Sequence, residues 1–165
     1  MKQIFTVLFT MLLCLSTKAQ DGSPEFYKIC GDPTMESTLN FRSSGKVVDI
    51  IDGDTLVIKS NNKRRIIDLV TVDASSNNSN AKEFLFKKIL KKNVFFLVTG
   101  NGKSDDAQIF ADVFYKDISI NRKMITTGTA QYKKPASYTF SNYKSCVYQQ
   151  LEEIAKKEKL GIWAK

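Results

Sequence analysis

Three short runs of aliphatic residues, separated by polar turns, dominate the region between positions 45 and 73. The first run, Val47–Ile51, ends at Asp52-Gly53, and this dipeptide is a strong hairpin signal between apolar runs. The second run is Leu56–Ile58, and the third, Ile66–Val72, ends at Asp73. This pattern predicts three consecutive strands that fold as an antiparallel meander.

The rest of the chain alternates between helical and strand-like patterns. Asn121 is expected to cap one of the helices, and Gly128 is a suitable residue to end it. The expected elements are a helix over Ala81–Lys92, strands over Val94–Val98, Ile109–Tyr115 and Ile118–Ile120, a helix from Asn121, and a last helix with an apolar stripe of Val147, Leu151, Ile154 and Ala155. Three helices that follow or interrupt a set of strands indicate an α+β fold.

The first 19 residues have the pattern of a secretory signal peptide. Lys2 precedes an almost wholly apolar stretch, Ile4–Leu15, and small residues lead to an expected cleavage after Ala19. A lipoprotein anchor at Cys14 is the weaker alternative, because Leu13 stands where a small residue is expected. We therefore expect a signal peptide over 1–19, an N-terminal extension over 20–44, a folded domain over 45–165, and a secreted or periplasmic protein without a membrane anchor.

Export changes how the cysteines and the charge are interpreted. Cys30 and Cys146 remain after cleavage, and an oxidising compartment favours one disulfide between them, with two free thiols as the alternative. Loss of Lys2 and Lys18 lowers the formal charge from +8 to +6, which suits a polyanionic partner. The absence of histidine excludes catalysis by an imidazole base and a Cys/His zinc site.

Two carboxylates stand at the ends of neighbouring predicted strands. If the three strands form a meander, Asp54 and Asp73 can converge, and such hard oxygen ligands suit Ca²⁺ or Mg²⁺. Taken alone, the segment around Asp52-Gly53 is better explained as a turn without further function, and it is Asp73 that favours a metal site.

Several motifs occur together in an order that resembles the staphylococcal-nuclease-like (thermonuclease) family. They are Asp52-Gly53-Asp54-Thr55, Val72-Asp73, the stretch Asn121 to Ala130, and the ending Ala155 to Trp163. The resemblance covers about 120 residues and implies a five-stranded Greek-key OB-fold barrel with three helices.

The same resemblance implies a site for Ca²⁺-dependent phosphodiester hydrolysis. Its two metal-binding aspartates correspond to Asp54 and Asp73, and its metal-binding carbonyl to Ala74. Its two arginines and its glutamate correspond to other residue types, which are Asp68, Gln108 and Ser76. The metal side of the site is thus retained in sequence, whereas the residues that would meet the phosphate are replaced.

Three hypotheses follow from this replacement. The first is an exported monomeric domain with a degenerate active site that binds single-stranded nucleic acid or another polyanion, with Arg64, Tyr132 and Tyr138 as candidate contacts and a weak Ca²⁺ site. The second is a weak Ca²⁺-dependent nuclease acting on DNA or RNA whose cations come from other positions, for instance Arg64, Arg65 or Lys103. The third is a structural or protein-interaction module with an incidental basic surface.

Overall fold

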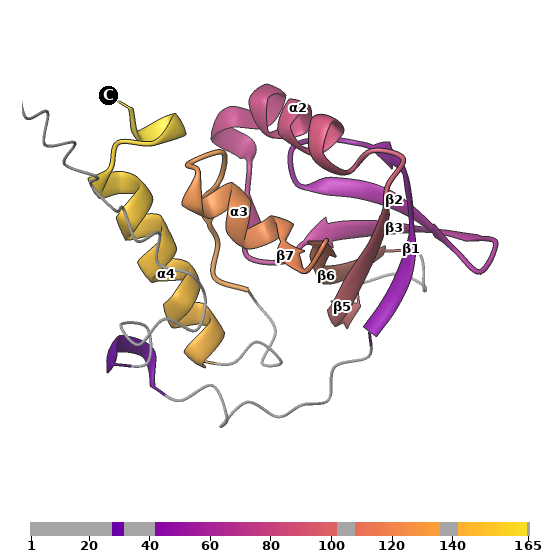
Figure 1. Cartoon of the computed structure of the whole chain (residues 1–165), viewed down its shortest axis with the longest axis horizontal. Helices are drawn as coiled ribbons and strands as arrows, with labels where there is room; N and C mark the ends of the chain where they lie inside the picture. The colour runs from indigo at the N-terminus through magenta and orange to yellow at the C-terminus, as the bar shows by residue number, and fades with distance from the viewer. Residues whose placement is uncertain (1–27, 32–41, 102–107, 136–141, 165) are drawn as a thin grey trace, which may run out of the picture.

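Hydrogen bonds join five strands into a closed barrel in the computed structural model, which describes residues 28–31, 42–101, 108–135 and 142–164 (Figure 1). The strands are β1 (Arg42–Ile50), β2 (Thr55–Ser60), β3 (Lys63–Leu69), β5 (Asn93–Asn101) and β6 (Gln108–Tyr115). Antiparallel pairing runs in the order β3-β2-β1-β5-β6, and parallel pairing of β3 with β6 closes the barrel. The fold is therefore α+β with a five-stranded barrel, as predicted.

The remaining elements surround this barrel. They are β4 (Val72–Asp73), β7 (Ile118–Ser119), β8 (Gln131–Tyr132), α2 (Asn78–Ile89), α3 (Ile120–Thr126), α4 (Asn142–Lys157), and the 3₁₀ turns η2 (Ser75–Asn77) and η3 (Gly161–Trp163). Figure 1 shows α3 between the barrel and α4. Within the described residues, no helix is long and apolar enough to cross a membrane.

Alternation along the strands places the core inside the barrel. Val47, Ile58 and Ile67 are fully buried, while the residues next to them in sequence are more exposed. Helix α2 buries Ala81, Leu85 and Ile89 on one side, as an amphipathic helix does.

The third strand ends earlier than the apolar run suggested. β3 stops at Leu69, because Thr71 adopts a left-handed backbone conformation with φ of 68°. Beyond this turn, Val72 and Asp73 form the separate strand β4, which pairs with β8. The turn thereby moves Asp73 out of the barrel sheet and next to Gln131 of β8.

The prediction that Asn121 caps α3 is wrong, since Ser119 has that role. The Ser119 hydroxyl accepts a hydrogen bond from the backbone N–H of Arg122 at 3.1 Å. Asn121 is fully buried inside the first turn of α3. Its amide accepts from the N–H of Val113 at 3.0 Å and donates to the carbonyls of Val70 at 2.8 Å and Ala111 at 3.1 Å.

Two glycines allow the end of α3 to touch the C-terminal turn. Gly128 ends α3 with φ of +62°, as expected for a residue that terminates a helix, and Gly161 has φ of +53°. A Cβ atom on Gly128 would lie 2.1 Å from the Leu160 carbonyl oxygen. The Gly128 carbonyl accepts a hydrogen bond from the N–H of Ile162 at 2.9 Å, so the contact is backbone against backbone.

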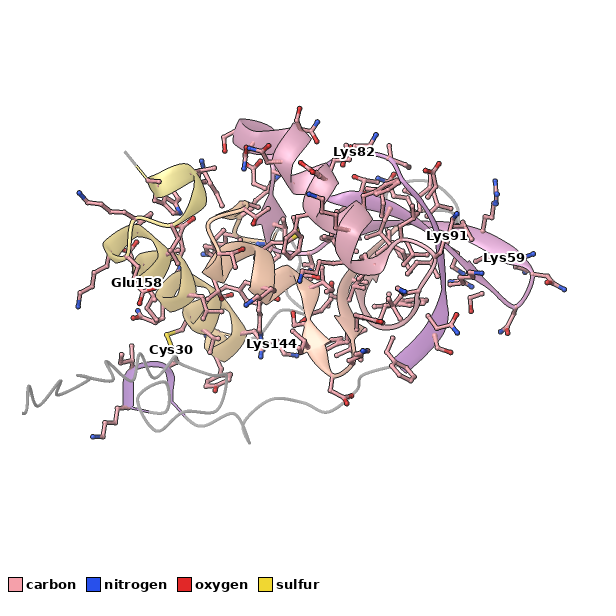
Figure 2. The ribbon with its side chains drawn as sticks, turned by 45° about the horizontal axis from the view of Figure 1, so that its top comes forward. Cys30, Lys59, Lys82, Lys91, Lys144 and Glu158 are labelled. Carbon is pink, nitrogen blue, oxygen red and sulfur yellow. A yellow bond between two sulfur atoms is a disulfide. The ribbon has the colours of Figure 1, made fainter. Side chains whose placement is uncertain are left out.

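The predicted disulfide is present. Cys30 and Cys146 are bonded, with their Cα atoms 5.5 Å apart, and the bond connects a helical turn at residues 28–30 to α4 (Figure 2). It spans 116 residues of sequence and so restricts the unfolded chain strongly.

Replacing Asn121 with alanine should lower the free energy of unfolding by about 3 kcal/mol, because buried backbone groups on two strands lose their partner. Chemical denaturation would measure this loss. The exposed Asn93 offers a control, and Asn93→Ala should change stability by less than about 0.5 kcal/mol. Equal effects of the two substitutions would contradict the structural role given to Asn121.

Removing the disulfide with the double substitution Cys30→Ser and Cys146→Ser should cost up to about 5 kcal/mol, the value that loop entropy gives for so long a loop. A reducing agent should destabilise the wild-type protein by a similar amount in denaturation experiments. It should leave the double variant unchanged, and an equal response of both proteins would show that reduction acts elsewhere.

Candidate functional site

The turn between β1 and β2 is fixed by its own first carboxylate. The Asp52 side chain accepts hydrogen bonds from the backbone N–H groups of Asp54 at 3.0 Å and Thr55 at 2.8 Å. The N–H of Gly53 donates to the Asn78 side chain at 2.6 Å, and a Cβ on Gly53 would lie 2.6 Å from that of Ala74. Glycine therefore lets this turn approach the start of α2 closely.

This turn brings Asp54 to the chain segment that follows β4. The N–H of Ala74 donates to the Asp54 carboxylate at 3.4 Å, and the N–H of Leu69 donates to the Asp54 carbonyl at 2.8 Å. Asp54 thus lies beside the backbone of Ala74, and convergence of the Asp54 and Asp73 carboxylates stays a prediction. The neighbouring Thr55 pairs with Asp68 across the β2–β3 ladder.

The electrostatic environment of Asp54 is acidic. Burial raises its pKa to about 6, and a hydrogen bond and repulsion from Asp52 and repulsion from Asp68 act in the same direction, while the N–H of Ala74 opposes them. Partial burial tends to raise the pKa of Asp52 as well, but hydrogen bonds from Asp54 and Thr55 outweigh it and hold that pKa below its ordinary value.

Asp73 stands in a different environment. Its pKa is lowered by hydrogen bonds from Ser75, whose backbone N–H donates at 2.9 Å, and by the positive charge of Lys133. The backbone N–H of Lys133 donates to the Thr71 carbonyl at 2.8 Å, which continues the β4–β8 pairing. Sequence reasoning missed Lys133, because only this pairing brings it to Asp73.

The oxygen donors at this place match the type that Ca²⁺ prefers. The carboxylates of Asp54 and Asp73 and the carbonyl of Ala74 would hold the ion, although that carbonyl already accepts from the N–H of Asn77 at 2.9 Å. Across the described ranges, no three acidic, histidine or cysteine side chains cluster in a way that could hold a metal ion. The donor set therefore suits a weak site, and the role of these three residues as ligands stays a prediction.

The two positions where the resemblance places arginines lie side by side. The Gln108 side-chain amide donates to the Asp68 carboxylate at 2.7 Å, across the parallel β3–β6 pairing. Ser76, at the glutamate position, accepts a hydrogen bond from the Gln131 side chain at 3.1 Å. These positions thus carry one negative charge and two neutral polar groups.

The candidate nucleic-acid contacts lie in three different settings. Arg64 is exposed on β3 and pairs with Lys59 across the β2–β3 ladder. The Tyr132 ring is partly buried and stacks against Tyr148, with ring centres 6.2 Å apart. Tyr138 lies outside the described residues. A role in nucleic-acid binding stays a prediction for all three candidates.

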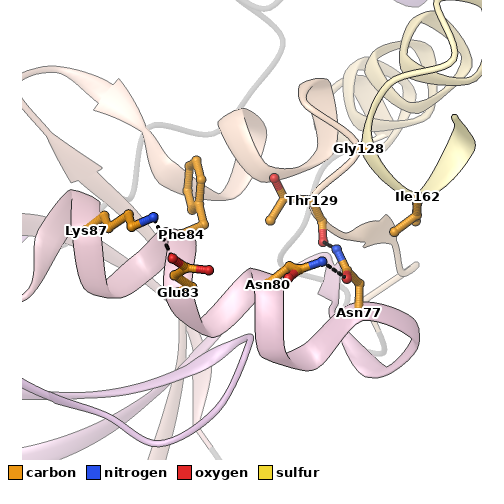
Figure 3. Close-up of a pocket in the computed structure, with 9 residues that line it drawn as sticks. Asn77, Asn80, Glu83, Phe84, Lys87, Gly128, Thr129 and Ile162 are labelled. Carbon is orange, nitrogen blue, oxygen red and sulfur yellow. Dashed lines mark hydrogen bonds and ion pairs between the residues drawn. The ribbon is translucent and has the colours of Figure 1, made fainter.

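A separate hollow of about 450 Å³ lies between α2, the turn after α3, and η3 (Figure 3). Its lining includes the glycine pair described above, the Phe84 ring, and an ion pair between Glu83 and Lys87 at 2.5 Å. Asn77 donates to the Thr129 carbonyl at 3.2 Å in its wall. Asn77, in the wall of this hollow, lies in η2 and follows Ala74 of the candidate metal site by three residues.

A closed five-stranded barrel with helices packed against it is the architecture of an OB-fold protein. A sequence profile described as "Staphylococcal nuclease homologue" matches residues 57–165. The chain therefore belongs to the staphylococcal nuclease homologue family. The match begins three residues after Asp54 and includes Asp68, Asp73, Ala74, Ser76 and Gln108. No single characterised protein matches the chain at a significant level.

Replacing Asp54 with asparagine should stabilise the protein at pH 7, measured with a chelator present. The folded-state pKa of about 6 lies above the ordinary 3.8, so the charged form is disfavoured in the folded protein above pH 6. Because the group is half exposed, we expect a gain of about 1 kcal/mol instead of the full value of the shift.

This gain should vanish as the pH falls toward about 4, where the wild-type carboxyl is protonated in the folded protein too. Denaturation curves at both pH values would measure it. Asp117→Asn, at an exposed turn, is the control and should show no such pH-dependent gain. A loss of stability at pH 7 in Asp54→Asn would contradict this account.

Proposed function

We propose that this protein is an exported nuclease-like domain that binds single-stranded nucleic acid and hydrolyses it poorly or not at all. The hydrogen bond between Gln108 and Asp68 carries the proposal. The two residues occupy the positions where the family resemblance implies arginines, and their side chains satisfy each other without any added cation. A phosphate arriving there would meet a carboxylate and an amide.

The expected penalty for catalysis is large. Phosphoryl transfer depends on cations that meet the charge developing on the phosphate, and loss of one such donor typically costs about 10²–10³ in rate. The Asp68 charge adds repulsion of about 3 kcal/mol toward a phosphate about 5 Å away, at an effective dielectric constant of 20. The chain therefore lacks two stabilising groups and gains an opposing one.

Binding has better support than cleavage. The positive charge of Lys133 beside Asp73 offers one phosphate contact that is independent of the arginine positions. A Ca²⁺ ion, when bound, would supply further positive charge, and Asp54 and Asp73 would orient it. The net charge is +8 for the full chain and +6 without residues 1–19, and phosphate neutralisation is the main source of affinity for nucleic acid.

Export is supported by two features of the chain. The Cys30–Cys146 bond is typical of an oxidising compartment, and the apolar N-terminal stretch has the signal-peptide pattern. A secreted or periplasmic location follows as part of the proposal.

A weak nuclease is the second candidate function, and Lys133 is the observation that favours it. This lysine is a cation that reaches the candidate site from β8, a position that the family motifs do not use. Among the other cations proposed as replacements, Arg64 lies four residues from Asp68 on the same strand, or about 13 Å. At that distance, Arg64 cannot reach a phosphate bound next to Asp68 without a large shift of the strand.

The direct test measures binding and cleavage of labelled single-stranded DNA and RNA, with Ca²⁺ or with a chelator. We expect binding in both conditions and cleavage at or near background. Robust Ca²⁺-dependent cleavage that Asp54→Ala abolishes would establish the weak-nuclease alternative. Absence of binding to both nucleic acids would contradict the proposal and favour a protein-interaction module.

Replacing Asp68 with arginine should tighten binding of a nucleotide bisphosphate by at least about 10-fold, because it replaces a repulsive charge with a bidentate phosphate donor. Titration calorimetry would measure the change. Asp117→Arg makes the same change of charge at the exposed turn after β6 and should have a much smaller effect. Equal gains from both would show that only the net charge matters.

The triple substitution Asp68→Arg, Ser76→Glu and Gln108→Arg should increase cleavage by more than the product of the single effects. Groups that act as one catalytic unit are strongly non-additive, so no single replacement should restore activity. Full rescue by one replacement would contradict the view that all three positions are defective.

A further inference from the structure

Three cations stand in one row across the outer face of the barrel, away from the candidate carboxylates. Lys46 on β1 pairs with Lys59 on β2, and Lys59 pairs with Arg64 on β3. All three side chains are exposed, and the neighbouring Val47 and Ile58 point into the core. We call Lys46, Lys59 and Arg64 the cation row.

This arrangement is unfavourable for the free protein. Like charges directly opposite each other on neighbouring strands destabilise a sheet. Among the described residues, no ion pair connects a member of the cation row to a carboxylate. Asp49 is the acidic residue that lies closest along the ladder, where it pairs with Val57 two steps from the row.

Two more lysines extend the positive surface beyond the row. The backbone N–H of Lys91 donates to the Val47 carbonyl at 2.9 Å, and the Lys92 carbonyl accepts from the N–H of Val47 at 2.9 Å. Both lysines are exposed and therefore flank the end of the row at Lys46. Figure 2 shows Lys59 and Lys91 on the side of the molecule away from α4.

We propose that the cation row binds the phosphate backbone of single-stranded nucleic acid, and this inference rests on the proposed function. Arg64 and Asp68 share the outer face of β3 and are about 13 Å apart along the strand. An extended polyanion could therefore run along β3 from the candidate site to the row. The row supplies the positive charge that the Asp68–Gln108 pair lacks.

An anionic membrane is the other surface that such a row could meet, and the neighbouring residues disfavour it. A protein surface that inserts into a bilayer interface combines cations with exposed large apolar side chains. Within the described structure, β1, β2 and β3 carry no exposed large apolar side chain, and on the neighbouring β5 one such residue, Phe95, lies opposite Ser44, two residues from Lys46. The row is therefore suited to electrostatic contact without insertion.

The test compares the wild-type protein with the triple variant Lys46→Gln, Lys59→Gln and Arg64→Gln. Binding of a labelled oligothymidylate is measured by fluorescence anisotropy between about 50 and 200 mM salt. Loss of three phosphate contacts on a single strand should reduce the slope of log affinity against log salt by about 2. The wild-type protein should therefore lose about 20-fold more affinity than the variant over this range.

The matched control removes three exposed lysines elsewhere, with Lys88→Gln, Lys157→Gln and Lys159→Gln. It makes the same change in net charge and should keep most of the wild-type salt dependence. The single variant Lys59→Gln adds a second readout. It removes the central charge, so it should raise the midpoint of thermal unfolding while it weakens binding.

The outcomes separate this inference from the proposed function. If the wild-type protein binds but the triple variant keeps both its affinity and its salt dependence, the cation row is excluded and the proposed function stands. If the wild-type protein binds no oligonucleotide, the proposed function itself fails, and the inference fails with it. If the triple variant loses binding only to phosphatidylserine vesicles, the row belongs to a membrane contact and the inference is overturned.

Discussion

Closure of the barrel by the parallel pairing of β3 with β6 is the constraint on which the remaining structure depends. The two strands are far apart in sequence, and hydrogen bonds of Asn121 connect the chain just after β3 to β6. Its buried amide connects the chain after β3, through the Val70 carbonyl, to the backbone of β6 at Ala111 and Val113. A single asparagine can do this because its side chain both donates and accepts hydrogen bonds.

The same pairing determines the chemistry of the candidate site. It places Gln108 next to Asp68, so that the two residues satisfy each other in a hydrogen bond. Arginines at these positions would meet a phosphate together. The pair found here instead leaves the nearby Asp54 among negative groups, and its raised pKa reflects burial and this repulsion. Where the family resemblance implies two arginines, the pair presents one negative charge and one neutral amide.

Positive charge is concentrated elsewhere on the barrel. The register of β1, β2 and β3 aligns Lys46, Lys59 and Arg64, whereas the acidic residues gather at the β1–β2 turn and at the end of β3. Such separation of charges along one face suits a ligand that is long and negative and is held at several points. It does not suit a compact phosphate group that must be surrounded on all sides for reaction.

Sequence alone predicted most of the strands and helices and the turn at Asp54, because these depend on local periodicity and on turn chemistry. The order of the family motifs implied the barrel, and the presence of two cysteines after residue 19 led to the disulfide. Sequence reasoning failed where contacts between segments that are far apart in the chain determine the position of a residue. Asn121 has the residue type of a cap but is buried against β6, and Lys133 reaches Asp73 only through the two-residue pairing of β4 with β8. The hydrogen bond of Asp68 with Gln108 and the alignment of the cation row likewise depend on strand register. Register is set by the packing of the whole barrel core, and no local pattern in the chain encodes it.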